Sequence, residues 1–169
     1  MSKLRKIAII INVILIVLTV SIIFRNSLQS AKASTAESEG LTEIVEKLPP
    51  IEEAIENNKI TSKDVEISLR SLAHVAEFAA LGALSMLLIL IIEPKSLRLW
   101  VISPPLFCLV IGIADECLQL LSDRACEAID VVKDFAGGIL GGLLVLAVFG
   151  IFRLAHTKRT KERISPDKV

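Results

Sequence analysis

Ionisable and amide side chains interrupt three apolar stretches of this sequence, and each group lies near one end of its stretch. The residues are His74 and Glu77, then Asp115, Glu116 and Gln119, and finally Asp130 and Asp134. His74 and Glu77 are three residues apart and Asp130 and Asp134 are four apart, so each pair shares one side of a helix. An imidazole among carboxylates can exchange protons with a bound ligand, and the same groups can bind a metal cation.

The elements that must position these side chains are membrane-spanning helices. About twenty apolar residues cross a bilayer as a helix, and the sequence has four such stretches, at residues 7–24, 72–92, 99–121 and 129–152. Hydrophobic residues make up 53% of the chain and charged residues 22%, which fits a membrane protein with one polar segment. We therefore predict an all-α fold, a four-span transmembrane helical bundle. Ionisable groups inside such spans are costly, so by default they mark a functional site.

The first apolar stretch has a second interpretation. Basic residues precede it, and Ala31-Lys32-Ala33 resembles a signal-peptidase site. The stretch is longer than the apolar part of a usual signal peptide, and the triplet lies seven residues past Phe24. We expect a retained span, with cleavage as the alternative.

Lysine and arginine residues set the expected orientation, because they collect on the cytoplasmic side. They precede the first span, follow the fourth, and include Lys95 and Arg98 between the second and third spans. We predict an N-in/C-in topology in which residues 25–69 form a long extracytoplasmic loop after the first span. Residues 1–156 are expected to form the membrane domain, and residues 157–169 a mobile basic cytoplasmic tail.

The extracytoplasmic segment is acidic, and its sequence predicts some local order. Residues 27–38 are rich in serine and alanine and are expected to form a loop. Residues 41–48 and 51–57 are expected to form short helices, the first ended by a proline pair. Thr61 and Asp64 have the spacing of a capping box, which predicts that the second spanning helix begins outside the lipid. We expect this segment to cover the outer ends of the spans.

In this topology the three polar groups reach the outer leaflet together, and Asp115 lies about 9 Å from the outer end of its span. The candidate catalytic residues are His74, Glu77, Asp115, Glu116 and Asp134. The candidate ligand-binding residues are Arg70, Gln119, Arg124 and Asp130. A structural ion-pair network is the alternative, with Arg70 and Arg124 neutralising carboxylates. The five carboxylates outnumber these two arginines, so some are expected to be protonated, to bind a cation or to face a wet cavity.

Small residues follow the aspartates of the fourth span. Gly137 and Gly141 continue the helix side of Asp130 and Asp134, and glycines at this spacing let helices approach closely. The side that carries the carboxylates is therefore expected to be the packed side.

Neither a cofactor nor nucleic acid is expected. The three cysteines do not have the spacing of a zinc site. A divalent cation is the less favoured alternative, because the polar groups contain a single histidine. The net charge is zero and no basic stripe with interleaved aromatic residues is present, which disfavours a nucleic-acid partner. A proton or cation pathway is disfavoured because the cytoplasmic halves of the spans carry no charges. Protein partners stay open.

Three motifs lie in order on the last three spans. They are Arg70-x-x-x-His74-x-x-Glu77-Phe78, Asp115-Glu116-x-x-Gln119-x-x-x-x-Arg124, and Asp130-x-x-x-Asp134-x-x-Gly137-x-x-x-Gly141. Together they resemble the VanZ-like family of membrane proteins, and Ser27 and Gln29 after the first span match that family more loosely. The resemblance implies a multi-pass protein of the bacterial cytoplasmic membrane. The member that gives the family its name is associated with low-level teicoplanin resistance.

Two functions follow from these observations. The first is a polar site at the outer leaflet that binds or modifies the headgroup of an envelope lipid or glycan, linked to tolerance of teicoplanin-type glycopeptides. The second is a non-catalytic protein that binds glycopeptide or assembles with envelope enzymes, in which the buried charges form a structural ion-pair network. The resemblance implies no particular reaction, so whether the protein is an enzyme stays open.

Overall fold

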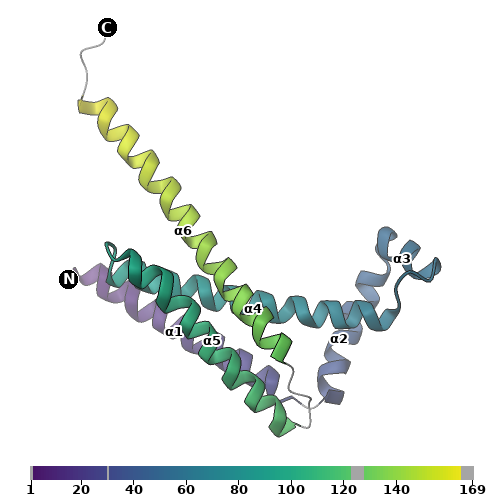
Figure 1. Cartoon of the computed structure of the whole chain (residues 1–169). Helices are drawn as coiled ribbons and strands as arrows, with labels where there is room; N and C mark the ends of the chain where they lie inside the picture. The colour runs from purple at the N-terminus through teal and green to yellow at the C-terminus, as the bar shows by residue number, and fades with distance from the viewer. Residues whose placement is uncertain (1, 30, 123–127, 165–169) are drawn as a thin grey trace.

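A computed structural model of the chain describes residues 2–29, 31–122 and 128–164. Within these ranges the chain is all helical, without strands (Figure 1). The helices are α1 (Lys3–Ser27), α2 (Ala31–Glu46), α3 (Pro49–Glu56), α4 (Ser62–Ile92), α5 (Leu97–Gln119) and α6 (Ala128–Ile164), and a short 3-10 helix, η1 (Leu120–Ser122), follows α5.

Four helices, α1, α4, α5 and α6, are long and apolar enough to cross a membrane. The predicted all-α class and the four membrane-compatible helices are therefore confirmed. The predicted capping box is also present. The hydroxyl of Thr61 accepts from the backbone N–H of Asp64, and the Asp64 carboxylate accepts from the Thr61 N–H at 2.9 Å. This cap starts α4 at Ser62, ten residues before the apolar stretch.

The loop predicted for residues 27–38 is wrong. Helix α1 continues through Ser27, and α2 already begins at Ala31. The serine-rich composition suggested a loop, but alanine, lysine and glutamate in the same stretch have high helix propensity. The proline pair was expected to end the first short helix, but α2 already ends at Glu46. Pro49 and Pro50 instead form the first turn of α3, where the missing N–H of Pro49 has no helical partner to lose. Asn58 ends this region with a φ of 53°, which asparagine tolerates well.

The segment between the first two spans is therefore mostly helical rather than a long loop. Helix α2 packs against α4, and α3 contacts α2. Helix α2 lies beside the N-terminal part of α4 (Figure 1). Thr42 of α2 is buried.

Glycines bring the backbones of α4 and α6 into contact. A Cβ atom added at Gly141 would lie 1.8 Å from the carbonyl oxygen of Ala79, and one at Gly82 would lie 2.0 Å from that of Gly138. At Gly137 the distance to the Val75 carbonyl oxygen would be 2.5 Å. Side chains would not fit at these positions, so the glycines set how closely the two helices cross.

Helix α1 is fastened to the far end of α4. The Arg5 guanidinium donates to the carbonyl oxygens of Ile91 and Ile92 at 2.8 and 2.7 Å. These carbonyls have no partner within their own helix, and a cation at a helix C-terminus is favourable. The N-terminus of α1 therefore lies at the same end of the bundle as the turn between α4 and α5.

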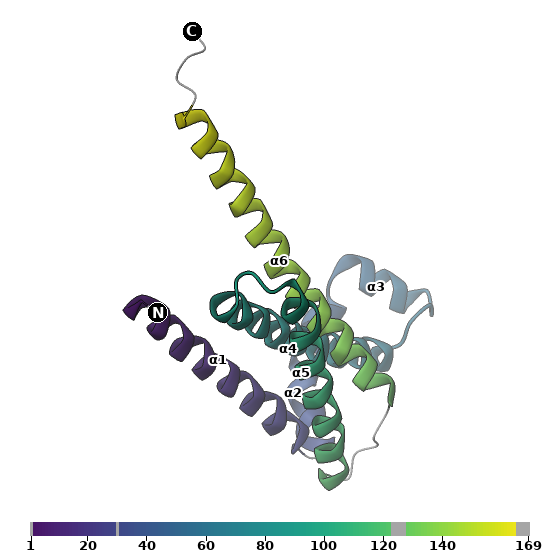
Figure 2. The same cartoon turned by 60° about the vertical axis from the view of Figure 1, so that its left-hand side comes forward.

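Helix α6 extends past the other helices at its C-terminal end, as both views show (Figure 1 and Figure 2). It continues to Ile164, so the first part of the predicted tail, residues 157–164, is helical. Residues 165–169 lie outside the described part of the chain.

Candidate functional site

Polar side chains from all four long helices gather where the ends of α1 and α5 meet α4 and the first turns of α6. We call this group the polar cluster, and its members are Asn26, Ser27, His74, Glu77, Asp115, Glu116, Gln119 and Asp134. Ser27, the three α5 residues and Asp134 are buried, and the other three are half-buried. Buried polar groups are costly unless they are hydrogen-bonded, so their partners need to be found one by one.

Asp115 is held by two donors from different helices. The Ser27 hydroxyl of α1 donates to Oδ1 of Asp115. The side-chain amide of Gln119, one turn further along α5, donates to Oδ2 of Asp115 and to Oε1 of Glu116, both at 3.1 Å. Asp115 is therefore fixed in orientation, and α1 is tied to α5.

Glu77 is tied to the same end of α1. The side-chain amide of Asn26 donates to Oε1 of Glu77 at 2.7 Å. The last turn of α1 thus supports a carboxylate on α5 and another on α4. Ser122, just after α5, donates to the backbone carbonyl of Ser27 at 2.7 Å and closes this end of the bundle.

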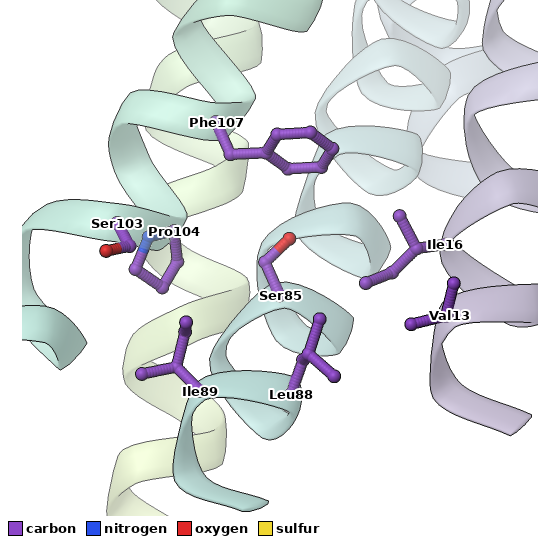
Figure 3. Close-up of a pocket in the computed structure, with 8 residues that line it drawn as sticks. All are labelled: Val13, Ile16, Ser85, Leu88, Ile89, Ser103, Pro104 and Phe107. Carbon is purple, nitrogen blue, oxygen red and sulfur yellow. The ribbon is translucent and has the colours of Figure 1, made fainter. Parts of the chain in front are cut away.

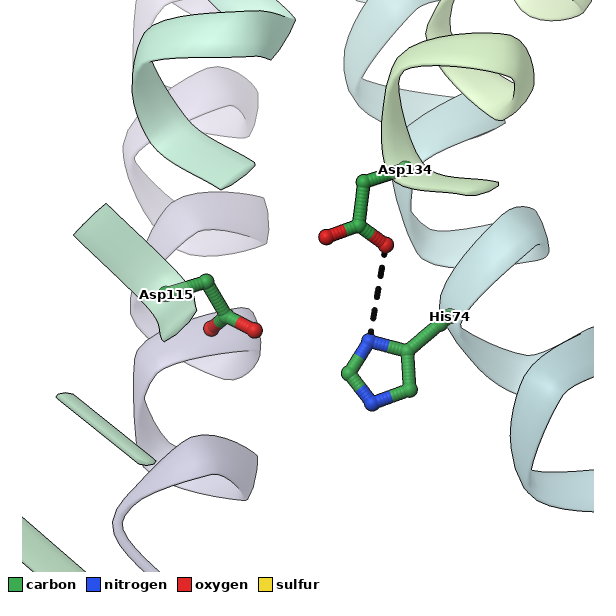
Figure 4. A group of neighbouring side chains, drawn as sticks. All are labelled: His74, Asp115 and Asp134. Atoms are coloured by element: carbon green, nitrogen blue, oxygen red, sulfur yellow. Dashed lines mark ion pairs between the residues drawn. The ribbon is translucent and has the colours of Figure 1, made fainter. Parts of the chain in front are cut away.

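Three ionisable members of the cluster, one from each of α4, α5 and α6, lie close to one another. His74, Asp115 and Asp134 each contribute one nitrogen or oxygen atom, and these atoms all lie within 4.8 Å of one another (Figure 4). His74 Nδ1 is 3.6 Å from Asp134 Oδ1, which is an ion-pair distance but too long for a hydrogen bond. Asp134 is fully buried, and neither of its carboxylate oxygens has a hydrogen-bond partner among the described residues.

Two predicted binding residues lie in other pairs. Arg70 forms an ion pair with Glu66 on its own helix at 3.6 Å. Asp130 accepts from Lys133 at 2.6 Å, and Lys133 also donates to the Ser71 hydroxyl. Arg124, the other arginine among the predicted ligand-binding residues, lies outside the described part of the chain.

Sequence reasoning missed two kinds of partner. Asn26 was not predicted, and Ser27 was noted only as a loose match to a family motif, because both follow the first apolar stretch where a loop was expected. The feature of the sequence that could have identified Asn26 and Ser27 is that both polar residues follow an uncharged apolar stretch within one helical turn. Lys133 was missed as the partner of Asp130, although its i+3 position places it on the same helix side.

An apolar cavity of about 310 Å³ lies between α1, α4 and α5 (Figure 3). Its lining includes Ile16, Leu88 and Phe107 and two serines, Ser85 and Ser103. Ser85 already donates to the Leu81 carbonyl at 2.7 Å. Ser85 is about 16 Å along α4 from His74, and the buried core residues Phe78 and Leu81 lie between them in sequence. This cavity offers apolar surface rather than reactive groups, so the chemistry belongs to the polar cluster.

The order of these polar groups along four membrane-compatible helices can be compared with known families. A sequence model described as VanZ/LLP1 matches residues 12–153, which include every member of the polar cluster. The chain belongs to the VanZ/LLP1 family. The predicted family resemblance is thereby confirmed, and with it a multi-pass membrane protein. Searches among curated proteins and among solved structures gave no significant match.

Carboxyl groups are the main chemical groups of the polar cluster. It contains four carboxylates and one imidazole, with amide and hydroxyl groups holding three of the carboxylates. Such a site accepts hydrogen bonds from hydroxyl or ammonium groups, and it can hold a cation. His74 beside Asp134 is also a pair through which a proton could be exchanged with a ligand.

Proposed function

We propose that this VanZ/LLP1 family member is a cell-envelope protein that binds the headgroup of an envelope lipid or glycan in the polar cluster. The site would open to the outer leaflet of the bacterial cytoplasmic membrane. This orientation rests on the basic residues at the N-terminus, at Lys95 and Arg98, and in the C-terminal tail. Arg5 supports it, because it joins the N-terminus of α1 to the α4 end next to Lys95.

The observation that carries the proposal is that Asp134 is buried without a hydrogen bond to any described residue. A fully buried carboxylate without hydrogen bonds is costly, so a ligand that supplies donors would stabilise the site. Sugar hydroxyls and ammonium groups supply such donors, and both occur on envelope headgroups. Among the described residues, Lys133 pairs with Asp130 and Arg70 with Glu66 rather than with Asp134. The ion pair of Asp134 with His74 leaves both of its carboxylate oxygens without a hydrogen bond.

His74 gives the same site a route to acid–base chemistry. Its imidazole is half-buried and lies beside Asp134, so it can give or take a proton on a headgroup that the carboxylates orient. Altered binding or modification of an envelope precursor would change how the cell responds to teicoplanin-type glycopeptides. This is the phenotype that we expect.

A deletion strain complemented with variants tests the proposal. We expect His74→Ala and Asp134→Asn to lose glycopeptide tolerance and to change the envelope lipid profile while their protein levels stay normal. Glu93→Gln is the matched control, because it makes an acid-to-amide exchange at an exposed position at the other end of α4. Full complementation by both site variants would disprove the proposal. Loss of the protein itself in both variants would favour a structural network.

A second candidate function is non-catalytic binding of a glycopeptide or an envelope enzyme by the acidic outer helices. It is favoured by the exposed glutamates of α2 and α3, which are Glu39, Glu43, Glu52, Glu53 and Glu56. Exchange of these residues for glutamine leaves the polar cluster intact. It would abolish tolerance only if this second function holds.

A further inference from the structure

We propose that His74, Asp115 and Asp134 form a binding site for a divalent transition-metal cation such as Zn²⁺ or Mn²⁺. The three residues come from α4, α5 and α6, and their side chains face one another (Figure 4). One ligand atom from each lies within 4.8 Å of the others.

The spacing is close to that of a metal site. Nitrogen and oxygen ligands about 2.0–2.2 Å from a tetrahedral cation lie about 3.3–3.6 Å from one another. His74 Nδ1 and Asp134 Oδ1 are 3.6 Å apart, so this pair already has the separation that a shared cation requires. Asp115 would need to move only slightly toward these two atoms to act as the third ligand.

An independent observation points to a missing ligand. Asp134 is fully buried, and both of its carboxylate oxygens and Nδ1 of His74 are buried without a hydrogen-bond partner in the described part of the chain. Buried polar atoms nearly always have a partner, and a bound ion is one of the ways to supply it. A single cation between these atoms would satisfy the imidazole nitrogen and a carboxylate oxygen together.

The surroundings of the three residues also fit metal ligation. The hydroxyl of Ser27 and the amide of Gln119 hold the Asp115 carboxylate, as outer partners hold ligating carboxylates in metal sites. Each Asp115 oxygen keeps a further lone pair for a cation. Gly112, three residues before Asp115, lies against Asp134, because a Cβ there would lie 3.3 Å from the Cβ of Asp134.

The ligand types decide the class of cation. Two carboxylates balance the charge of a divalent ion. The imidazole suits Zn²⁺ and disfavours Mg²⁺ and Ca²⁺, which prefer oxygen ligands, while Mn²⁺ suits the two carboxylates. One histidine alone made a metal site the less favoured expectation from the sequence. The structure brings the three residues together from three helices, which the sequence does not reveal. A metal site is therefore favoured more strongly by the structure than by the sequence. Three protein ligands leave coordination positions open for a bound molecule.

Metal binding by the purified full-length protein tests this inference. The protein is stripped with a chelator in detergent and incubated separately with ZnCl₂, MnCl₂ or MgCl₂. It is then desalted, and its metal content is measured. We expect close to one Zn²⁺ or Mn²⁺ per chain and little Mg²⁺. Co²⁺ should give visible absorption bands that report a nitrogen and oxygen ligand set.

Variants identify the ligands in the same assay. Asp134→Asn and His74→Ala should each weaken binding at least about 100-fold, and Ser27→Ala, which removes an outer partner, about tenfold. Glu93→Gln should bind as the wild type does. Circular dichroism and a monodisperse elution profile establish that each variant is folded.

Two outcomes would overturn the inference. One is a wild-type protein that retains far less than one equivalent of every cation. The other is a folded Asp134→Asn variant that binds metal as tightly as the wild type. The assay contains no envelope lipid, so a negative result leaves headgroup binding through hydrogen bonds standing. A positive result does not establish headgroup binding.

Discussion

The hydroxyl of Ser27, in the last turn of α1, donates a hydrogen bond to the carboxylate of Asp115 in α5. The two residues are 88 positions apart in sequence. The first span is therefore part of the site rather than only a membrane anchor, and its end holds Asp115, which lies close to His74 and Asp134.

Substitution of Ser27 by alanine should lower stability by about 1–3 kcal/mol, because a buried carboxylate loses a donor. Thermal unfolding of the purified protein in one detergent measures the change. Ser21→Ala is the matched control, since the Ser21 hydroxyl is exposed and donates only to the carbonyl of Val17 in its own helix. Equal effects of the two substitutions would show that the Ser27–Asp115 bond contributes nothing.

Asn26 should tolerate loss of its side chain better than exchange for aspartate. Asn26→Ala removes the 2.7 Å hydrogen bond to Glu77, whereas Asn26→Asp removes the donor and sets a second carboxylate against Glu77. We expect the unfolding temperature to fall further for Asn26→Asp. Adding Glu77→Gln should recover most of that loss, because an amide can donate to the new carboxylate. An Asn26→Asp variant as stable as Asn26→Ala would contradict this pairing.

Gly141→Ala should destabilise the bundle by about 1–3 kcal/mol. The added Cβ would lie 1.8 Å from the Ala79 carbonyl oxygen, and a backbone oxygen cannot move aside without its helix. Gly150→Ala on the same helix is the control, because nothing lies within 4 Å of a Cβ there. That variant should be neutral or slightly more stable, since alanine favours helix more than glycine does. The two variants can be compared by unfolding and by the fraction that elutes as folded protein.

The orientation can be measured with reporter fusions. Alkaline phosphatase fused after Asn58 should be active because it lies outside the cytoplasm, and the same enzyme fused after Val169 should be inactive. The expectation follows from the basic residues next to the first and fourth spans and in the turn between the second and third. The opposite pattern would place the polar cluster at the inner leaflet and disprove an outer-leaflet headgroup site.

The spans and much of the polar cluster could be predicted because their signals are strong. Long apolar stretches specify spanning helices, and a carboxylate such as Asp115 or Asp134 stands out within them. The depth of each residue follows from its position along the helix. The capping box of Thr61 and Asp64 is a local signal, and it was interpreted correctly for the same reason.

The pairing of side chains could not be predicted, because it depends on how the helices rotate and cross. Asp130 and Asp134 share one side of α6, yet Lys133 takes the first and leaves the second beside His74. Asn26 was missed because a loop was expected after the first span. The alanine-containing sequence from Ala31 onward forms helix α2. Its composition alone does not decide between a helix and a loop.

The glycine contacts between α4 and α6 limit how the site can change its width. Val75 and Ala79 of α4 meet glycines of α6 through backbone atoms, so no side chain can change rotamer to let these helices separate. His74 and Asp134 belong to this rigid pair. The opposite wall is Ser27 and Asp115, on α1 and α5, which are joined to each other by a hydrogen bond. Entry of a ligand from the side would therefore require α1 or α5 to move away from α4 and α6, and a movement of α1 would break the Asn26–Glu77 hydrogen bond that ties it to α4.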